Sequence, residues 1–429
     1  MSYVSDAQDL PRGTANITSG EFTACPFDHY RSLQQVGPIF TAPGIGYGVI
    51  GYRELVELGR DTKRFSRQLD MTETRRLFGV DAGSLPAEVD RLLVEASTHS
   101  PALFSADPPI HTRHRKLVSQ AFLPRRVRAM EPMVQAHASR LMEPFAAAGG
   151  GDIISQLAVP LPLAVLGDIL GVDCADLDLL KRWSDDLLRG IGGIVDPDER
   201  VSIAHSLLQF QSYFFERIQE RRSQPCDDLL SDLVHAEVGG EGHLRLDELF
   251  PIIVQLVVAG HETTANFIGN AMVILLRRPE LVAKLRADET AIPAFLEECL
   301  RFDPPLHATV RRAACDMHFG GVAIERDETI LPFWGAANHD PTIFPDPDRF
   351  DPDRDNLRRH LTFGHGIHFC IGAELARMEG RVAFETFLRR FSHVELEEQR
   401  SDLTDRGGYS HYGYRRVVVR IGSTESGDE

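Results

Sequence analysis

One cysteine stands in a setting that favours chemistry. Cys370 belongs to the run FGHGIHFCIG at residues 363–372, directly before a segment with helical spacing. A helix N-terminus carries partial positive charge and free N–H groups, and both lower the pKa of a thiol and favour the thiolate. Gly366 and Gly372 would let the backbone approach a flat cofactor closely. The turn therefore predicts a thiolate that can bind a metal.

The residues alone leave two other interpretations of this turn open. A buried structural cysteine beside glycines is common. His365, His368 and Cys370 are also residue types that bind zinc. No fourth ligand stands nearby at helical or hairpin spacing, which argues against a zinc site.

A second chemical group lies in the middle of a long apolar segment. Residues 247–278 predict one helix of about 30 residues, roughly 45 Å long, that crosses the centre of the molecule. The run AGHETT at residues 259–264 interrupts it with polar side chains. His261 and Glu262 suggest the HExxH motif of zinc proteases, but Ala265 stands where the second histidine belongs, so that interpretation fails.

The ten residues around Cys370 resemble the haem-binding loop of the cytochrome P-450 monooxygenases, F-G-x-G-x-[HR]-x-C-x-G, at every fixed position. The resemblance implies that Cys370 is the axial thiolate ligand of haem b, where it pushes electron density onto the iron and favours O–O cleavage. Phe363, Gly364 and Gly372 belong to the same motif. His368 occupies the position that usually contacts a haem propionate.

Further propionate contacts follow from the resemblance. His111 and Arg115 are four residues apart, on one helix face, in a segment that resembles the one leading into the family's C helix. Arg311 follows the break at Pro304 and Pro305, where another propionate arginine is expected. A planar guanidinium suits this task because it binds carboxylates bidentately.

The run at residues 259–264 resembles the family's [AG]-G-x-[DE]-T-[TS]. By resemblance, Ala259 and Gly260 make room for O2 and substrate over the haem. Glu262 and Thr263 are then the catalytic acid–alcohol pair, which relays the protons that O–O cleavage requires.

A structural group is also implied. Glu298 and Arg301, three residues apart on one helix face, resemble the family's E-x-x-R pair, which locks onto an arginine in a following loop. Arg349 matches this third member. A buried carboxylate shared by two arginines must be well paired, so we assign the trio to holding the loop that presents Cys370.

Candidate substrate contacts are less specific. Gln255 lies four residues before Ala259 and eight before Thr263, on the same helix face, and either bonds a substrate oxygen or bonds within the core. Residues 67–106 form a long excursion that we expect to be a lid. The remaining candidates are His307, Ala308, Thr309, His411 and Tyr412.

The surrounding pattern predicts a mainly α protein with a minor β part: one cytochrome P-450 domain over residues 1–429, irregular over about residues 1–20, with the haem between the long central helix and the cysteine loop. Residues 27–35, 53–59, 155–171, 201–222, 291–302 and 371–387 have helical spacing. Residues 47–52, 310–332 and 416–421 predict short strands.

Composition limits the partners and the compartment. The net charge of −17 argues against nucleic acid or anionic membrane as the main partner. Six irregularly spaced cysteines indicate a reducing compartment. Neither a signal peptide nor a membrane anchor is visible. We expect a bacterial, cytoplasmic protein.

The activity that we predict is hydroxylation or epoxidation of a mainly apolar small molecule with O2 and two electrons from a ferredoxin, or a flavodoxin, served by its reductase. Arg113 and Lys116 would form the docking patch. Two alternatives stay open: a non-catalytic haem-thiolate sensor and a peroxide-driven enzyme. Glu262 and Thr263 favour the monooxygenase, because a sensor needs no proton relay and peroxide-driven enzymes typically replace this pair.

Overall fold

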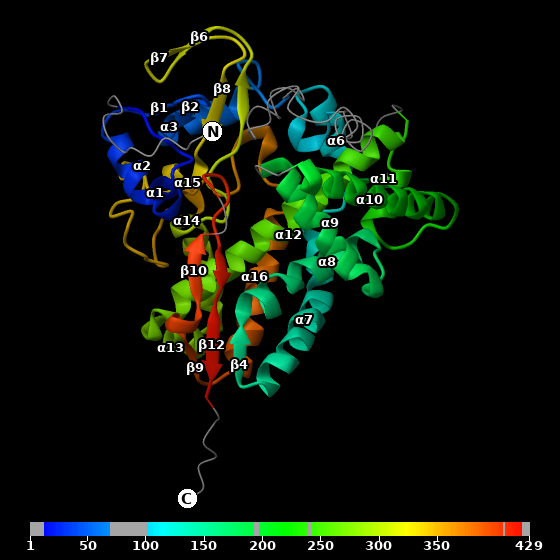
Figure 1. Cartoon of the computed structure of the whole chain (residues 1–429). Coiled ribbons are helices and arrows are strands. Elements are labelled where there is room, and N and C mark those ends of the chain that lie inside the picture. Colours follow the sequence, from blue (N-terminus) through cyan, green and yellow to red (C-terminus); the bar gives the residue numbers. More distant parts are fainter. Residues whose placement is uncertain (1–12, 69–100, 193–196, 238–241, 406–407, 423–429) are drawn as a thin grey trace, which may run out of the picture. The chain divides into compact units, whose positions relative to one another are not determined.

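The computed structural model describes residues 13–68, 101–192, 197–237, 242–405 and 408–422 (Figure 1). The chain divides into two compact units. The first comprises Met1–Ser66, Glu297–Phe369 and Thr404–Arg415, and the second comprises the intervening segments and the C-terminus. The chain therefore passes from the first unit to the second between Phe369 and Cys370. The single domain over residues 1–429 stays a prediction.

The first unit is built around a five-stranded sheet in the order β1-β2-β8-β5-β3. β2 pairs antiparallel with β1 and parallel with β8, whose four residues are all buried. The strands are β1 Ile39–Ala42, β2 Gly46–Val49, β3 Phe65–Ser66, β5 Arg311–Ala313 and β8 Thr329–Pro332, and β6 Met317–Phe319 and β7 Val322–Ile324 form a separate hairpin.

Short helices complete the first unit. Phe22, Tyr30, Phe40 and Phe333 pack together as an aromatic core beside the sheet. The helical segments are α1 Gly20–Ala24, α2 Pro26–Gln34, α3 Tyr52–Arg60, α15 Trp334–Ala337 and the 3₁₀ turns η5 Leu357–Arg359 and η6 Gly366–His368. Helix α14, Ile292–Phe302, carries Glu298 and Arg301 in its second half.

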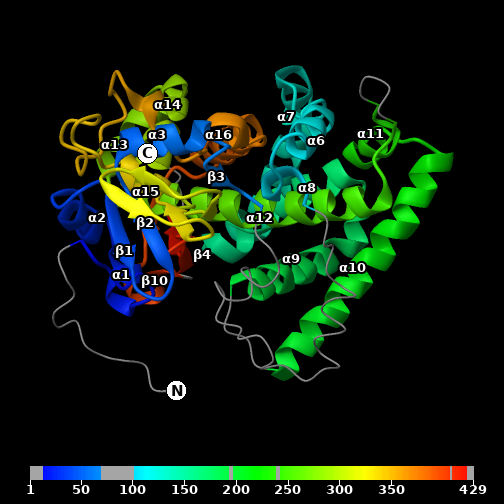
Figure 2. The ribbon, with the colours of Figure 1, turned by 90° about the horizontal axis from the view of Figure 1, so that it is seen from above.

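The second unit is mainly helical. Helix α16 packs on α7, α12 packs on α8, and α9 lies beside α10 (Figure 2). The helices are α6 Ile110–Val118, α7 Pro124–Ala147, α8 Pro160–Leu170, α9 Leu177–Gly192, α10 Pro197–Ser223, α11 Leu229–His235, α12 Leu246–Leu276, α13 Pro279–Ala287 and α16 Ala373–Arg390. The 3₁₀ turns are η1 Leu103–Ser105, η3 Cys174–Asp176, η4 Glu289–Ala291 and η7 Glu398–Arg400.

Small sheets lie at the C-terminal end of the chain. β12, Val418–Ile421, pairs with both β4, Gly150–Asp152, and β9, Val394–Leu396. β10, Asp402–Asp405, pairs with β11, Tyr414–Arg416. A mainly α fold with a minor β part is therefore confirmed.

The long central helix is confirmed as well. α12 runs for 31 residues against the predicted range of 247–278, and every residue from Thr264 to Leu275 is buried. A helix that is apolar on all sides must be surrounded by other elements. It therefore forms the centre of the second unit.

Two other predictions need comment. The predicted helix at residues 155–171 is divided into a π-helical turn at Ile154–Ala158 and α8, which begins at Pro160 because proline lacks the N–H that a continuing helix requires. Most of the predicted lid, residues 69–100, lies outside the described residues. None of the helices in the described ranges combines the length and apolar character that crossing a membrane requires.

Candidate active site

The middle of α12 is open on one face. Val258, Glu262 and Thr263 are partly exposed and Ala259 is exposed, whereas the residues on either side are mostly buried. Glu262 and Thr263 follow Val258 and Ala259 by four residues each, so the four side chains share one face of the helix. We call Val258, Ala259, Glu262 and Thr263 the open face. A Cβ on the adjacent Gly260 would meet only Leu166, at 3.6 Å, so this stretch of helix is uncrowded.

The polar groups of the open face are bonded only lightly. The Thr263 hydroxyl donates to the Ala259 carbonyl at 2.7 Å, a bond within its own helix. His261, directly before Glu262 on α12, is buried, and its Nδ1 lies 3.1 Å from the Ser184 hydroxyl of α9. Thr263 and Glu262 therefore face outward, while His261 serves packing against α9.

Cys370 lies in the same unit as the open face and directly before α16. The protein atoms around its thiol raise the pKa, while the Gly372 backbone N–H and the cations of Arg115 and Arg377 lower it, with a raised pKa as the balance. Metal coordination deprotonates a thiol regardless of such a balance. The predicted lowering of the thiol pKa by the helix N-terminus alone was therefore wrong: the protein surroundings favour the thiol, and a bound metal would have to produce the thiolate.

Helix α6 brings His111 and Arg115 to this unit. His111 is 3% exposed, and burial lowers its pKa to about 4, with the neighbouring Arg115 as a second cause. Burial also lowers the pKa of Arg115, while Cys370 opposes that shift. The structure thus places Arg115 within electrostatic reach of Cys370. A neutral imidazole and a guanidinium are both donors for carboxylates.

These donors fit a haem. A cysteine sulfur at a helix N-terminus, two donors for propionates on α6 and an uncrowded helix face with an acid and an alcohol all belong to the second unit. Zinc is less suitable, since four nitrogen, sulfur or oxygen ligands are required. Among the described residues, no three histidine, cysteine, aspartate or glutamate side chains come together as a metal site.

The first unit holds the remaining predicted haem contacts. Arg311 on β5 is buried and donates to the Val310 carbonyl at 3.0 Å. The adjacent Arg312 pairs with Asp327 instead. Successive residues of a strand point to opposite faces, which explains why the two arginines differ. His368 lies in η6, and Phe363 and Gly364 precede that turn, with Gly364 at φ 73°.

The structure gives Gly366 a packing role. Its φ of 75° favours glycine, and a Cβ there would overlap the carbonyl oxygen of Gly59 in α3. Gly366 therefore permits close packing of the turn on α3, and its approach to a cofactor stays a prediction. Nothing lies within 4 Å of a Cβ built on Gly372, so its surroundings are open.

Glu298 and Arg301 are paired as predicted. Both side chains are fully buried, and Arg301 donates from Nε and Nη2 to the two carboxylate oxygens, each at 2.7 Å. Arg301 also donates to the carbonyls of Asn338 and Pro347, both at 2.9 Å. These bonds tie α14 to two loops of the first unit.

The third member of the predicted trio was wrong. Arg354, five residues after Arg349, donates from Nε to Glu298 at 3.2 Å and also caps three loop carbonyls. The Arg349 side chain is 70% exposed and pairs with Asp351, while only its carbonyl accepts from Arg301. The loop has no periodicity from which the inward arginine could have been chosen.

Asn338 was missed by the sequence analysis. It is fully buried, donates to the Thr362 hydroxyl at 2.8 Å and accepts from the Leu361 N–H at 2.7 Å. Thr362 in turn donates to the Leu300 carbonyl at 2.6 Å. We call Glu298, Arg301, Arg354 and Asn338 the Glu298 network. It holds the chain directly before Phe363, where the ligand motif begins.

Of the predicted pocket wall at residues 307–309, His307 needs correction. His307 is 2% exposed, its Nδ1 lies 3.0 Å from the Tyr30 hydroxyl, and burial lowers its pKa to about 3. Ala308 is fully buried, and the Thr309 hydroxyl accepts from Trp334 at 3.0 Å. His307 is thus part of the aromatic core of the first unit.

The C-terminal candidates lie beside this segment. Leu306 bridges to His411, and the Tyr412 N–H donates to the Pro305 carbonyl at 3.0 Å. His411 and Tyr412 are both partly exposed. The structure therefore brings the two predicted groups together, with the C-terminal one on the more exposed side.

Gln255 bonds within the core, the second of its two predicted roles. Its buried amide binds the backbone of Phe104 and the hydroxyl of Ser105, in η1. Arg113, predicted to lie in a docking patch, forms an ion pair with Glu248 at 2.5 Å. Lys116 is exposed.

Comparison with known proteins gives one consistent result. The family model described as Cytochrome P450 matches residues 200–410. The chain is 39% identical to 6-deoxyerythronolide B hydroxylase of Saccharopolyspora erythraea over 74% of this chain and 77% of the relative. It is 36% identical to cyclomarin C epoxidase CymV of Salinispora arenicola, over 74% and 80%. Cytochrome P450 CYP109Q5 from Chondromyces apiculatus superimposes with a TM-score of 0.83 at 30% identity, covering 96% of this chain and 99% of that one.

Proposed function

The chain belongs to the cytochrome P450 family and is a haem-dependent monooxygenase, and we propose that it holds haem b with Cys370 as the axial ligand. Bound haem supplies the iron at which O2 is activated so that one oxygen atom enters the substrate. The observation that carries the assignment of residues is that Cys370 and the open face of α12 belong to one compact unit.

The open face supplies the protons. Glu262 is partly exposed, so its carboxyl can exchange protons with solvent. Thr263 is adjacent to Glu262. Its hydroxyl donates a hydrogen bond to the Ala259 carbonyl, and the hydroxyl oxygen can at the same time accept a hydrogen bond from another donor. Glu262 therefore delivers protons and Thr263 directs them, which is general acid catalysis through two groups.

The haem carboxylates would be held by donors on α6. His111 and Arg115 serve this purpose there, and the propionate contacts of Arg311 and His368 stay predictions from the resemblance. The neutral state of His111, which follows from its lowered pKa, leaves it an N–H donor without adding charge. Arg115 adds the positive charge that a propionate requires.

The substrate would be a mainly apolar small molecule. The names of two relatives point to 6-deoxyerythronolide B and cyclomarin C as the first compounds to test. A substrate that displaces water from the haem shifts the iron from low to high spin. Titration of these two compounds and a fatty acid, followed by product analysis with O2 and reductant, tests the proposal. A spin shift without any oxidised product from any compound would contradict it.

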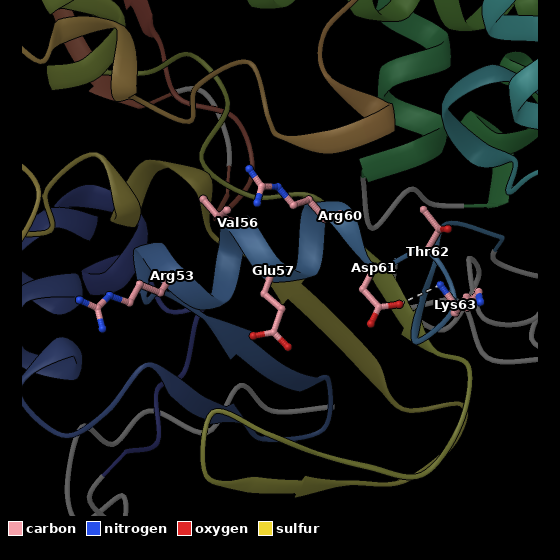
Figure 3. Close-up of a pocket in the computed structure, with 7 residues that line it drawn as sticks. All are labelled: Arg53, Val56, Glu57, Arg60, Asp61, Thr62 and Lys63. Carbon is pink, nitrogen blue, oxygen red and sulfur yellow. Dashed lines mark hydrogen bonds between the residues drawn. The ribbon is translucent and has the colours of Figure 1, made fainter.

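The electron donor would be an acidic ferredoxin that docks on α3. Figure 3 shows Arg53, Arg60 and Lys63 projecting from α3 and the turn after it. Arg60 donates to His365 at 3.0 Å, so this helix supports the turn that leads to Cys370. Arg64 pairs with both Glu57 and Asp61, each at 2.6 Å, and so offsets one of these two negative charges. Despite the net charge of −17, this face is therefore cationic.

Two arginines extend the cationic face. Arg358 and Arg359 of η5 are exposed, and the Arg359 guanidinium lies over the Tyr52 ring at the start of α3, 5.8 Å from its centroid. We call Arg53, Arg60, Lys63, Arg358 and Arg359 the α3 face. This position replaces Arg113 in our docking prediction, because Arg113 is already paired with Glu248.

Charge reversal tests the docking site. Arg53→Glu with Lys63→Glu should slow haem reduction by an acidic ferredoxin about tenfold at low salt, and added salt should reduce the difference. Reduction by dithionite should not change, because it needs no docking. Lys116→Glu is the matched control on α6. If Lys116→Glu slows reduction and the α3 variant does not, the donor docks at α6 instead.

The compartment follows from the thiols. All six cysteines lie in the described part of the chain and none is bonded to another. Cysteines without disulfide bonds are typical of a reducing compartment. We therefore infer a cytoplasmic location, in a bacterium as for the relatives named above, which fractionation of the native host would test.

A further inference from the structure

A short segment next to α12 is held at each of its residues. In η1, the Leu103 N–H donates to His114 Nδ1 at 3.3 Å, and the Phe104 N–H donates to Gln255 Oε1 at 3.1 Å. The Ser105 hydroxyl accepts from Gln255 Nε2 at 2.9 Å. Side chains from two different helices thus fix three consecutive residues.

Gln255 can hold this segment because its amide has both a hydrogen-bond acceptor and a hydrogen-bond donor. It is 8% exposed, and both ends of its amide are used. The Ser105 hydroxyl donates to the Ala102 carbonyl at 2.9 Å and accepts from the Ala102 N–H at 3.2 Å, so Gln255 must act as the donor in its bond to this hydroxyl. Glutamate has no such donor, and methionine of similar shape has neither group.

Two further contacts hold the same segment. Arg67 donates from Nε to the Phe104 carbonyl at 2.7 Å, and its guanidinium lies 5.4 Å from the centroid of the Phe104 ring. His114 is tied to Glu248 on the first turn of α12, with Nε2 3.2 Å from the carboxylate. Burial lowers the pKa of His114, so its Nδ1 stays available as an acceptor for Leu103.

The backbone of η1 indicates that these contacts act together. Leu103 has φ 39°, in a region that a residue with a side chain rarely adopts. Such a conformation persists only when the surroundings determine it from several sides. The hydrogen bonds to His114 and Gln255, together with burial of the Leu103 side chain, hold Leu103 in this conformation.

Gln255, which holds η1, lies on α12 close to the open face. Gln255 is four residues before Ala259 and eight before Thr263, so it lies about 6 Å and 12 Å along the same face of the helix. Phe104 is partly exposed, and its backbone N–H is held by Gln255, one helical turn before Ala259. We infer that its side chain would touch a ligand that extends beyond Ala259.

We propose that Gln255 is a positioning residue that clamps η1 onto α12 and thereby fixes Phe104 as a wall for the part of a ligand that extends beyond the open face. The inference rests on the proposed haem site in this unit. It assigns Gln255 to ligand fit and not to the proton relay or to haem binding.

Two azoles that ligate haem iron test the clamp without knowledge of the substrate. Imidazole occupies only the space next to the iron, whereas 4-phenylimidazole adds a ring that extends beyond it. In Gln255→Met, the loss of two buried hydrogen bonds should weaken 4-phenylimidazole binding about 3–10-fold and leave imidazole within about twofold. Both dissociation constants come from the shift of the haem absorption on titration.

Three variants make the result specific. Ser105→Ala should weaken 4-phenylimidazole in the same direction, and the double variant with Gln255→Met should lose less than the sum of the two, because both remove the bond between Gln255 and Ser105. Gln219→Met, an exposed glutamine on α10, should leave both azoles unchanged. An unchanged ratio of the two dissociation constants in Gln255→Met and in Ser105→Ala would overturn the clamp. If the unaltered protein gives no azole spectrum at all, the haem assignment fails first, and the two failures are distinguishable.

Discussion

The Glu298 network and the open face of α12 differ in how deeply their polar groups are buried and how fully these groups are hydrogen-bonded. In the network, Glu298 and Arg301 are fully buried, and both oxygens of the carboxylate are paired. On the open face, Glu262 is partly exposed and Thr263 bonds only within its own helix. Buried charge is tolerated only when its partners are complete. A group that must exchange protons cannot be enclosed in that way.

The difference separates stability from chemistry. The network joins α14 to the loops that precede the ligand turn, so its loss should act on folding. The open face contributes little to packing, so its loss should act on turnover. Variants in the two regions should therefore fail in different assays.

Removal of one network partner should give the largest effect. Arg301→Ala or Glu298→Ala leaves a buried charge without its partner, which costs about 3–5 kcal/mol. Since whole domains are stable by about 5–15 kcal/mol, little folded, haem-loaded protein should be recovered. Haem content per purified protein and the thermal midpoint measure the loss. Normal haem incorporation in both variants would remove the structural role of the network.

Arg349→Ala is the matched control for the network. Its exposed pair with Asp351 should contribute less than about 1 kcal/mol. Arg354→Ala should behave like Arg301→Ala, because Arg354 reaches the same carboxylate. A larger loss for Arg349→Ala than for Arg354→Ala would restore our original trio.

Thr263→Ala should act on turnover alone. The helix and its packing remain, and substrate binding should survive, because the hydroxyl serves proton delivery. Product formation should fall about 100-fold, within the usual range for general acid catalysis. Reductant should still be consumed, with hydrogen peroxide rising as product falls. Glu262→Gln should instead slow reductant consumption, because it limits proton supply before the pathways divide.

Thr264→Ala is the control for this experiment. Its side chain is buried on the same helix, so the hydroxyl should contribute to packing and not to proton transfer. Full coupling in Thr263→Ala together with peroxide release in Thr264→Ala would move the relay to Thr264.

Glu379 on α16 sharpens the comparison, because it is a buried acid whose Oε2 has no hydrogen-bond partner in the described structure. Burial raises its pKa from 4.5 to about 8. The stability due to the protonated group is therefore full below pH 4.5 and is lost as the pH rises towards 8. Glu379→Gln should raise stability at pH 8 by on the order of 2 kcal/mol and flatten the dependence of the thermal midpoint on pH between 6 and 8. A wild-type midpoint that does not fall over this range would contradict the buried neutral acid.

The elements were predictable where periodicity carried the information. The apolar spacing of residues 247–278 gave α12 to within two residues at either end, and the strand and helix around Tyr52 were located as well. The motif around Cys370 indicated a candidate ligand because its spacing is local. Long-range pairings were not predictable from such patterns.

Three residues show why. Arg354 and Arg349 stand in one irregular loop, and only the folded path decides which side chain turns inward. Gln255 finds its partners about 150 residues away in η1. Gly366 has the conformation that a cofactor turn needs, yet the atom that excludes a side chain is the Gly59 carbonyl. Each depends on a segment distant in sequence.

The reduced carbon monoxide difference spectrum tests the central claim most directly. A haem whose ligand is the Cys370 thiolate should give the long-wavelength band that is characteristic of the family. Cys370→Ala should abolish this band while the apoprotein keeps its helical circular dichroism, because the thiol holds no network together. Retention of the long-wavelength band in Cys370→Ala would contradict the account.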